Sequence, residues 1–538
     1  MLQEDNIETN VIKYIDFEEV KQFSEFDQFY AKSANQCTEL YDYPADLEGI
    51  KNAIEQRKKY SIDRNTLVAS IKNNYDELKI KVSDSLINQL VEQNTFTITC
   101  AHQPNIFTGP VFFIYKLIST IKLAHQCNDN FPAYNFIPVI YLGSEDHDLQ
   151  ELNHIFLFGK KLTWETNQSG AVGRMKCTEM EQLKSDLFEK LGNSENATEL
   201  KKIIDLAYLP DHTISQAITI FLHLLLKDFK FLVLNADRPE LKALFKKQIV
   251  KDITEQRNQE LVIEGQKMMF AHHLQSQAHP REINFFYLQN ESRDRIIGSN
   301  DDFSVVNQDK TWNNQSLREE IEIHPENFSP NVILRPLYQE TILPSVAFVG
   351  GGGELAYWSD RKLLFNTNEV FFPVLIRRDS FLIIDSNTEN KLSKLHLSLE
   401  DLLLDDHKIQ LQIIQKNSEG TLDLSNEKFQ MGEIVNSIID KAVALDSTLK
   451  GYIGSEGNQI EKIILNIESR VLKTQKKRNE TLIDQALNLK HKLFPDGELQ
   501  ERKENFMSWY IKYGTRFIYQ IYNASNPMNI KMKIIKLD

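Results

Sequence analysis

FTITC at residues 96–100 and FIPVIYL at residues 136–142 are two short apolar runs that decide the fold of this chain of 538 residues. Between them, TGPVFFIYKLISTIKLAHQ places Phe112, Tyr115 and Leu123 at helical spacing. Strands that are buried on both faces read as continuous apolar runs, and a helix between two such strands forms a βαβ unit. The stretch therefore predicts an α/β protein whose parallel sheet is covered by helices on both faces.

The same order of elements returns farther along the chain. A helical pattern at 214–226 leads to a third apolar run at 231–234. Two further apolar runs lie at 346–349 and 372–376. Each run has the length of a buried strand and ends in polar or glycine residues, so we predict that all of them extend the same sheet.

Composition divides the chain into three regions. Residues 1–95 are polar and carry apolar side chains at three- and four-residue spacing, which predicts helices. Residues 96–390 contain the predicted α/β core, with insertions at about 156–210 and 250–330. Alternation within the second insertion predicts a small antiparallel piece. Residues 391–538 return to helical patterns.

The C-terminal region contains a long amphipathic stretch at 458–493. Apolar residues alternate by four and three at Ile460, Ile464, Ile467 and Val471, and again at Leu482, Ala486, Leu489 and Leu493. This pattern predicts a helix of about 50 Å with coiled-coil character. A stripe of this length needs an apolar partner, and no adjacent segment is complementary to it. We therefore favour an arm that forms a homodimer over a helix that packs on its own domain.

Composition also excludes several classes of protein. The chain has 62 Lys+Arg and 76 Asp+Glu, a net charge of −14, which argues against binding nucleic acid through bulk charge. Its most apolar stretch, 218–234, contains Lys227, Asp228 and Lys230 and is too short and too charged to cross a bilayer. The start, MLQEDNIETN, has no apolar stretch and predicts no signal peptide. Four cysteines without a CxxC motif predict neither disulfides nor a zinc site. We expect a cytoplasmic protein.

The loop at 101–110, AHQPNIFTGP, follows the first predicted strand and precedes a helix. Ligands of doubly wound sheets bind at the carboxyl ends of the strands, and helix N-termini attract anions. We expect His102 and Gln103 to face a nucleotide or another anion, with Thr108 and Gly109 near the start of the helix. A turn that only shapes the chain is equally consistent with this spacing.

The second strand ends in GSEDHD, which contains Glu145, Asp146 and His147. Asp146 and His147 are candidates for general acid and base, and Glu145 for binding substrate hydroxyls or amines. If a helix continued through this region, His147, Glu151 and His154 would share one face and could hold a divalent metal. Because the sequence offers no second ligand cluster, we expect no tightly bound metal here.

Four glycines follow the run at 346–349 and lead into a predicted helix. Without Cβ atoms, the backbone there can be approached closely by a phosphate or a sugar, although a flexible turn is the alternative. Arg335 precedes this strand, and the pair Arg377-Arg378 ends the last one. Guanidinium groups suit carboxylates or phosphates, although a solvated pair of charges is equally consistent with Arg377 and Arg378. Tyr357 can cover a bound ring or pack in the core. The residues assigned to substrate here are Gly351, Gly352, Gly353, Glu354, Tyr357, Arg335 and Arg377.

Four blocks of this sequence together resemble the family of the cysteine-adding enzyme of bacillithiol biosynthesis, BshC. They are HQPNIFTGPVFFIYKLISTI, PVIYLGSEDHDLQELNH, SPNVILRPLYQETILPSVAFVGGGGELAYW and LFPDGELQERKENFMSWYIKYGTRFI, in the order of the family. The resemblance implies a Rossmann-like core with two connecting-peptide insertions, as in class I aminoacyl-tRNA synthetases. It also implies a C-terminal coiled coil that makes a homodimer.

The resemblance further implies a ligase that joins cysteine, through its carboxyl group, to the amine of glucosaminyl malate, with ATP and Mg²⁺ activating the carboxyl. In that reaction Asp146 and His147 would position and deprotonate the amine, and Arg377 would pair with malate. Two alternatives are a nucleotidylyl-transferase that acts on another amino sugar and a non-catalytic scaffold that binds nucleotides or thiols.

Overall fold

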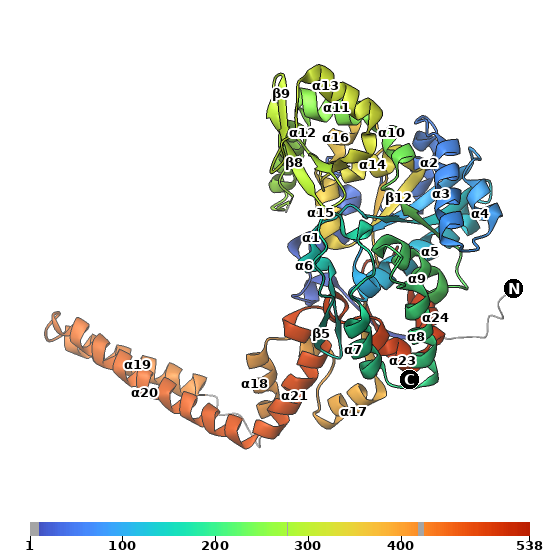
Figure 1. Cartoon of the computed structure of the whole chain (residues 1–538). Coiled ribbons are helices and arrows are strands. Elements are labelled where there is room, and N and C mark those ends of the chain that lie inside the picture. Colours follow the sequence, from blue (N-terminus) through green and yellow to red (C-terminus); the bar gives the residue numbers. More distant parts are fainter. Residues whose placement is uncertain (1–9, 277, 418–423) are drawn as a thin grey trace. The chain divides into compact units, whose positions relative to one another are not determined.

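The computed structural model describes residues 10–276, 278–417 and 424–538 (Figure 1). The chain divides into two compact units. The first comprises the described residues up to Ile383 together with Glu498–Leu537, and the second comprises Ile384–Gly497 and Asp538. Most of the acidic start, at 1–9, lies outside the described residues.

A five-stranded parallel sheet forms the centre of the first unit, with strand order β13-β12-β2-β3-β6. Its strands are β2 (Thr95–His102), β3 (Asn135–Leu142), β6 (Leu232–Asn235), β12 (Ser345–Gly350) and β13 (Val374–Arg377). Nearly every side chain in them is buried, as continuous apolar runs require. The predicted parallel sheet is therefore confirmed.

The order of the strands defines one point at which ligands are expected. From β2, the chain adds β3 and β6 on one side and later adds β12 and β13 on the other. Doubly wound sheets bind ligands outside the carboxyl ends of the two strands where this order reverses. The register aligns His102 with Leu142, and Gly350 with Arg377, so the predicted loops meet at one edge of the sheet.

Helices and two insertions surround this sheet. The helices α5 (Phe112–Asn130) and α9 (Ile214–Leu225) precede β3 and β6, as predicted. The first insertion holds β4 (His154–Leu157), β5 (Lys160–Thr163), α7 (Glu181–Leu191) and α8 (Glu195–Ala207). The second holds α11 (Lys246–Glu255), α12 (Asn258–Ala271), β7 (Phe285–Leu288), β8 (Arg293–Ser299), β9 (Asp302–Val305), β10 (Thr311–Trp312), α13 (Asn314–Ile323) and β11 (Phe328–Pro330). Its strands form an antiparallel sheet, which confirms the predicted antiparallel piece.

The N-terminal region is helical except at its start. Its helices include α1 (Glu25–Ser33), α2 (Leu47–Arg57), α3 (Arg64–Leu78) and α4 (Asp84–Gln89). The prediction of a wholly helical region misses β1 (Val11–Ile15), which pairs with β15 (Met532–Leu537) in a sheet completed by β14 (Ser380–Asp385). A strand of five residues is too short to show a clear period, and its partner lies at the other end of the chain.

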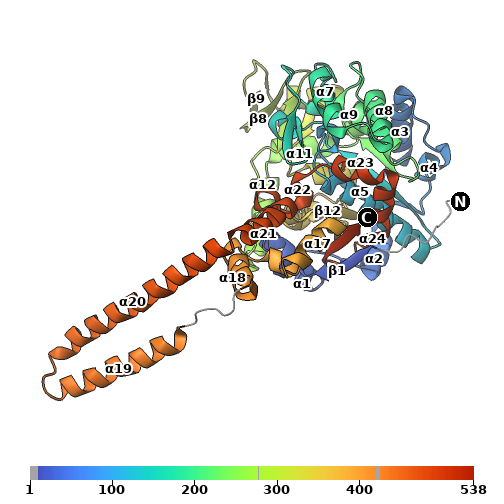
Figure 2. The ribbon, with the colours of Figure 1, turned by 90° about the horizontal axis from the view of Figure 1, so that it is seen from below.

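The second unit contains a helical hairpin. Its helices include α17 (Ser386–Lys394), α18 (Asp406–Asn417), α19 (Ser425–Val443), α20 (Leu449–Arg478) and α21 (Glu480–Leu493). Figures 1 and 2 show α19 and α20 side by side. The single helix predicted at 458–493 is wrong, because the backbone departs from helical geometry at Asn479 (φ −101°, ψ 10°) between α20 and α21.

The chain then returns to the first unit. The helices α22 (Gln500–Lys503), α23 (Met507–Tyr513) and α24 (Thr515–Ala524) belong to that unit, so the region predicted from residue 391 onward is shared between the two units. Among the helices of the described residues, none combines the length and the apolar character needed to cross a membrane.

Candidate functional site

His102, the last residue of β2, is buried. The residue is 8% exposed and its ring stacks on Phe113, with 3.9 Å between the ring centroids. Burial, together with the charges of Lys116 and Arg378, holds the pKa of His102 well below its ordinary value, so the imidazole is neutral at physiological pH. Its Nε2 has no hydrogen-bond partner among the described residues. His102 thus lies beneath the edge of the sheet, and burial limits the contact with a nucleotide or another anion that was predicted for it.

Thr108 and Gly109 lie inside the same loop. Both have positive φ angles, 70° and 63°, and the Thr108 side chain is fully buried. Their backbone N–H groups donate to the carbonyl oxygens of Asn105 and Ile106, at 3.2 and 3.0 Å. Because the loop itself uses these two donors, they are not available to the nucleotide or anion that Thr108 and Gly109 were predicted to contact.

Gln103 and Asp146 join the loops that follow β2 and β3. Gln103 Nε2 donates to Asp146 Oδ2 at 2.7 Å, and the backbone N–H of Asp148 donates to Asp146 Oδ1 at 3.2 Å. Asp146 is only half-buried. The structure therefore brings together two residues that the sequence assigned to different roles, and it leaves a carboxylate that is oriented and still accessible.

His147 contacts Arg293, which was not among the predicted site residues. Arg293 Nη1 donates to His147 Nδ1 at 3.0 Å, and its guanidinium lies 4.1 Å from the centroid of the Phe286 ring. Partial burial and the charge of Arg293 lower the pKa of His147, so the ring is neutral near pH 7. Since Nδ1 accepts this hydrogen bond, the ring proton resides on Nε2, which makes His147 a donor there.

Glu145 forms a buried ion pair with Lys242, which also donates to the carbonyl oxygen of Phe328 at 2.8 Å. Burial raises the pKa of Glu145, although Lys242 opposes the shift. The neighbouring Asp237 accepts two hydrogen bonds from Arg174, at 2.6 and 2.7 Å. The predicted contact of Glu145 with substrate does not fit this placement, because Lys242 already occupies its carboxylate.

Glu354 connects the glycine loop to the helix that follows β2. Its Oε2 accepts from the backbone N–H of Gly351 at 3.0 Å and lies 2.5 Å from Lys116 Nζ. Lys116 is 2% exposed on its side chain and also donates to the carbonyl oxygen of Ala101 at 2.7 Å. These contacts span β2 and β12, the two strands at which the order of the sheet reverses.

The glycines differ in what their missing side chains allow. A Cβ on Gly352 would lie 2.1 Å from Asp27 Oδ1, whereas one on Gly353 would have no neighbour within 4 Å. Asp27 in turn accepts from Arg377 Nε at 2.7 Å, and both side chains are buried. The predicted pairing of Arg377 with malate therefore does not fit, because Asp27 holds its guanidinium inside the protein.

Among the described residues, Arg335 donates hydrogen bonds to neutral groups only. It donates to Gln339 Oε1 and to the Tyr357 hydroxyl, each at 3.0 Å, and its guanidinium lies 5.3 Å from the centroid of the Tyr141 ring. Burial raises the pKa of Tyr141, and Arg335 and Arg293 both oppose this shift. Among the residues that the structure describes, neither Arg335 nor Arg293 forms an ion pair. Both guanidinium groups lie near Tyr141 and can bind an anion.

The arrangement of His147, Glu151 and His154 on one helix face is not formed. The helix α6 (Leu149–Leu152) has only one turn, and His154 is the first residue of β4.

Comparison with known families covers nearly the whole chain. Residues 11–379 match the model described as the N-terminal Rossmann-like domain of bacillithiol biosynthesis BshC, and residues 381–537 match its C-terminal coiled-coil domain. The chain belongs to the BshC family. This confirms the resemblance, the Rossmann-like core and the coiled coil. A BshC from Flavobacterium psychrophilum is 33% identical, over 97% of this chain and 99% of its own. One from Flavobacterium johnsoniae is 32% identical, over 96% and 98%. Both are named "Putative cysteine ligase BshC".

In this BshC-family chain, sequence reasoning missed most of the cations at the edge of the sheet. They are Lys116, Arg174, Lys242 and Arg293. Lys116 alone carried a signal, because it is a charged residue in the otherwise apolar FFIYKLISTI. The others lie in segments whose polarity is ordinary for a surface, so only the fold shows that they converge here.

Proposed function

We propose that this protein is a ligase that joins the carboxyl group of cysteine to the amine of glucosaminyl malate, in the last step of bacillithiol biosynthesis. ATP with Mg²⁺ would activate the carboxyl. Family membership over nearly the whole chain supports the reaction class. The observation that carries the assignment of the site is the accessible Asp146 carboxylate, held by Gln103 where the loops after β2 and β3 meet.

Amide formation requires an amine without its proton and donors for the oxygen that gains charge. We assign to Asp146 the role of the base that accepts the amine proton. Its two oxygens are oriented by neighbouring donors, and the carboxylate stays accessible. As the amine nitrogen bonds to the activated carbonyl carbon, its proton passes to Asp146 and the activating group departs with its electron pair. We do not assign this proton to His147, because its Nε2 already carries a proton and acts as a hydrogen-bond donor.

The anionic parts of the substrates would meet Arg293 and Arg335, whose partners are otherwise neutral. Malate carboxylates and nucleotide phosphates are both suited to guanidinium groups. The open space beside Gly353 also fits an anionic group that approaches the backbone.

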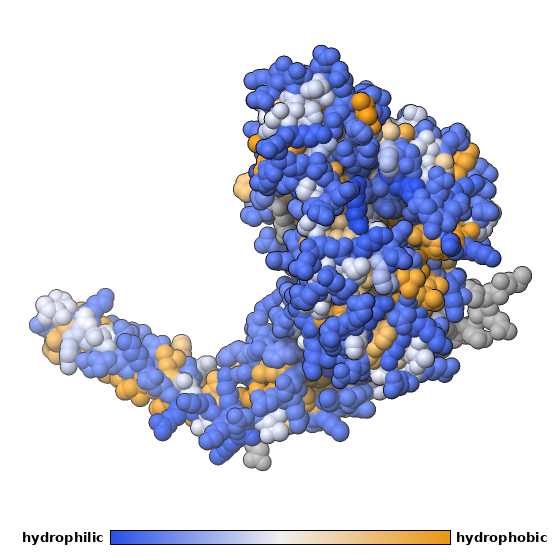
Figure 3. Space-filling model, in the orientation of Figure 1, coloured by the Kyte–Doolittle hydropathy of each residue, from blue (hydrophilic) through white to orange (hydrophobic). Residues whose placement is uncertain are grey.

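We further propose that the hairpin of α19 and α20 forms a homodimer. Neither helix has a buried residue within this chain, and Figure 3 shows apolar side chains along the hairpin. The exposed apolar residues are Phe429, Ile434, Ile438, Val443, Leu445, Leu449, Tyr452, Ile460, Ile463, Leu465 and Ile467. An apolar surface of this extent calls for a partner, and a second hairpin of the same kind is complementary to it. Because the proposed substrates are metabolites of the cell interior, we expect the dimer to work in the cytoplasm.

The test is mass spectrometry of the purified chain with glucosaminyl malate, cysteine and Mg²⁺, with and without ATP. We expect bacillithiol only with ATP, together with AMP or ADP. Asp146→Asn should abolish product, whereas Glu151→Gln, which alters an exposed carboxylate nearby, should not. Full activity of Asp146→Asn would refute the assignment of the base. Binding of the substrates without turnover would favour the scaffold, and pyrophosphate release without an amide would favour a nucleotidylyl-transferase.

A further inference from the structure

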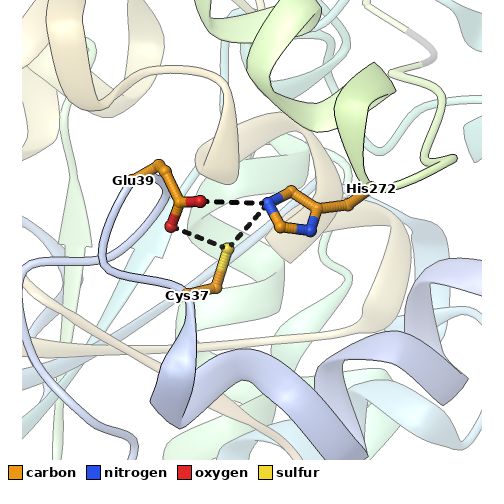
Figure 4. Close-up of side chains that lie close together, drawn as sticks. All are labelled: Cys37, Glu39 and His272. Atoms are coloured by element: carbon orange, nitrogen blue, oxygen red, sulfur yellow. Dashed lines mark hydrogen bonds and ion pairs between the residues drawn. The ribbon is translucent and has the colours of Figure 1, made fainter.

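Cys37, Glu39 and His272 form a cluster of three metal-ligating side chains in the first unit (Figure 4). Cys37 and Glu39 lie in the segment after α1, and His272 is the residue at which α12 ends. Cys37 Sγ lies 3.4 Å from His272 Nε2 and 3.6 Å from Glu39 Oε2, and His272 Nε2 lies 3.4 Å from Glu39 Oε1. The three groups therefore converge on one point from two segments that are distant in sequence.

These distances match the edges of a tetrahedral zinc site. Zinc binds thiolate sulfur at about 2.3 Å and imidazole nitrogen or carboxylate oxygen at about 2.0–2.2 Å. With tetrahedral angles, those bond lengths place the ligand atoms about 3.3–3.7 Å from one another. The distance from Cys37 Sγ to His272 Nε2 lies in this range, and each of these two atoms has one Glu39 oxygen in this range. Glu39, whose two oxygens face one neighbour each, needs only a rotation of its carboxylate.

A nucleophilic thiol is a poorer explanation of the cluster. Burial and the Glu39 charge raise the pKa of Cys37 to about 11, so the thiol stays protonated near neutral pH. A bound divalent metal reverses this, because the thiol proton leaves to solvent as the sulfur–metal bond forms. Zinc with one thiolate, one carboxylate and a neutral imidazole has no net charge, which suits a site where Cys37 is buried.

We propose that Cys37, Glu39 and His272 bind one zinc ion, with water in the fourth position. Sulfur and imidazole ligands favour zinc over Mg²⁺ or Ca²⁺, which prefer oxygen. The ion would tie the segment after α1 to the end of α12, and α1 also carries Asp27, the partner of Arg377. The proposal departs from the sequence expectation of no zinc site, because no local spacing joins residues 37 and 272. It does not depend on the ligase activity.

The test uses the full chain after its metal is removed with a chelator. Titration with Co²⁺ should saturate at one ion per chain, with the near-ultraviolet band of a thiolate–cobalt bond and the intense visible absorption of tetrahedral cobalt. Zn²⁺ should displace both signals. Cys37→Ser should abolish the thiolate band, and Glu39→Gln or His272→Ala should weaken binding at least about tenfold, the loss that even outer-shell partners of metal sites can cause.

The matched control is His324→Ala. His324 Nδ1 lies 3.1 Å from Glu326 Oε1, so this is another histidine–carboxylate pair, but one outside the Cys37 cluster. It should bind Co²⁺ like the unaltered chain. The proposal is overturned if the stripped chain keeps its far-ultraviolet circular dichroism and shows no thiolate band, or if the band persists in Cys37→Ser. Unchanged affinity in Glu39→Gln, whose side chain is half-exposed and whose folding should be unaffected, would also overturn it.

Discussion

Asp27→Asn tests the buried ion pair between Asp27 and Arg377. Asp27 and Arg377 have almost no exposed side-chain surface, and Arg377 Nε donates to Asp27 Oδ1 at 2.7 Å. The substitution keeps the volume of the side chain but removes its charge, which leaves the guanidinium buried without a counter-ion. Removing one partner of such a pair costs about 3–5 kcal/mol, so we expect Asp27→Asn to lower the free energy of unfolding by an amount in this range.

A double-mutant cycle separates the pair from its surroundings. Arg377→Met leaves the Asp27 carboxylate with Ser24, whose hydroxyl donates at 2.9 Å, and with the more distant Arg502 at 3.9 Å. The double variant has neither buried charge. It should therefore lose less than the sum of the two single losses, by about 1–3 kcal/mol.

The stability that Asp27→Asn removes should depend on pH, and the direction of this dependence follows from the pKa of Asp27. Burial raises the pKa of Asp27, but Arg377, Ser24 and Arg502 more than offset this and hold it below its ordinary value. A carboxyl group whose pKa is depressed on folding stabilises the protein above its unfolded pKa of about 3.9. That contribution disappears as the pH falls through the folded value. The difference in unfolding free energy between the unaltered chain and Asp27→Asn should accordingly shrink below about pH 4.

Urea unfolding followed by tryptophan fluorescence measures the relevant unit. The four tryptophans, Trp164, Trp312, Trp358 and Trp509, all belong to the first unit. Glu48→Gln is the control, because Glu48 and Lys51 form an exposed pair at 3.6 Å, and it should leave the midpoint unchanged. A loss below about 1 kcal/mol for Asp27→Asn, or full additivity in the cycle, would refute the reasoning.

Three further changes test other parts of the structure. Gly352→Ala should lower the free energy of unfolding by about 1–3 kcal/mol in the same urea assay, because its Cβ would lie 2.1 Å from a carboxylate oxygen of Asp27. Gly353→Ala, whose Cβ would have no neighbour within 4 Å, should leave the stability unchanged. It should raise the KM if substrate approaches the backbone there. Burial raises the pKa of Glu340 to about 7, so its neutral form is the stabilising one, and stability should fall as the pH rises from about 4.3 towards 7. Glu340→Gln should remove this slope, of at most about 1.4 kcal/mol per pH unit, in urea midpoints taken at several pH values. Ile438→Asp with Ile463→Asp places charges on side chains that are 49% and 57% exposed, and light scattering should show a monomer with unchanged circular dichroism.

The sequence predicted the central sheet because each of its strands is buried on both faces. Such strands are continuous apolar runs, and these runs need no knowledge of a partner. The sheet of β1, β15 and β14 could not be found in this way, since its strands are short and come from distant parts of the chain. The pairing of α20 with α19 was missed for a related reason. The helical pattern of a segment does not show which other helix packs against it.

The loops of the candidate site were predictable, but the exposure of their side chains was not. Strand ends place His102, Asp146 and Gly351 at one edge of the sheet whatever the rest of the chain does. Whether a side chain there faces solvent depends on neighbours far away in sequence. Arg377 is occupied because Asp27 reaches it from α1, and Glu145 because Lys242 reaches it from another segment. No pattern in the local sequence predicts these long-range contacts.

Most charged side chains at this edge of the sheet form ion pairs, and a few do not. Five cations are each matched to a carboxylate, in the pairs Arg377–Asp27, Arg378–Glu501, Lys116–Glu354, Lys242–Glu145 and Arg174–Asp237. Among the described residues, Arg293 and Arg335 are bound only by neutral groups, and Asp146 forms no ion pair. The carboxylates of Glu145, Asp146 and Asp237 also act on Arg293 through space, and that of Glu354 acts on Arg335. Two guanidinium groups without a direct carboxylate partner, together with the Asp146 carboxylate, suit a substrate that carries two carboxylates and one amine. Glucosaminyl malate has this composition, whereas with an amino sugar that lacks malate the guanidinium groups would have only nucleotide phosphates to bind. The two arginines therefore fit the proposed acceptor, and the mass-spectrometric test distinguishes this acceptor from a simpler amino sugar.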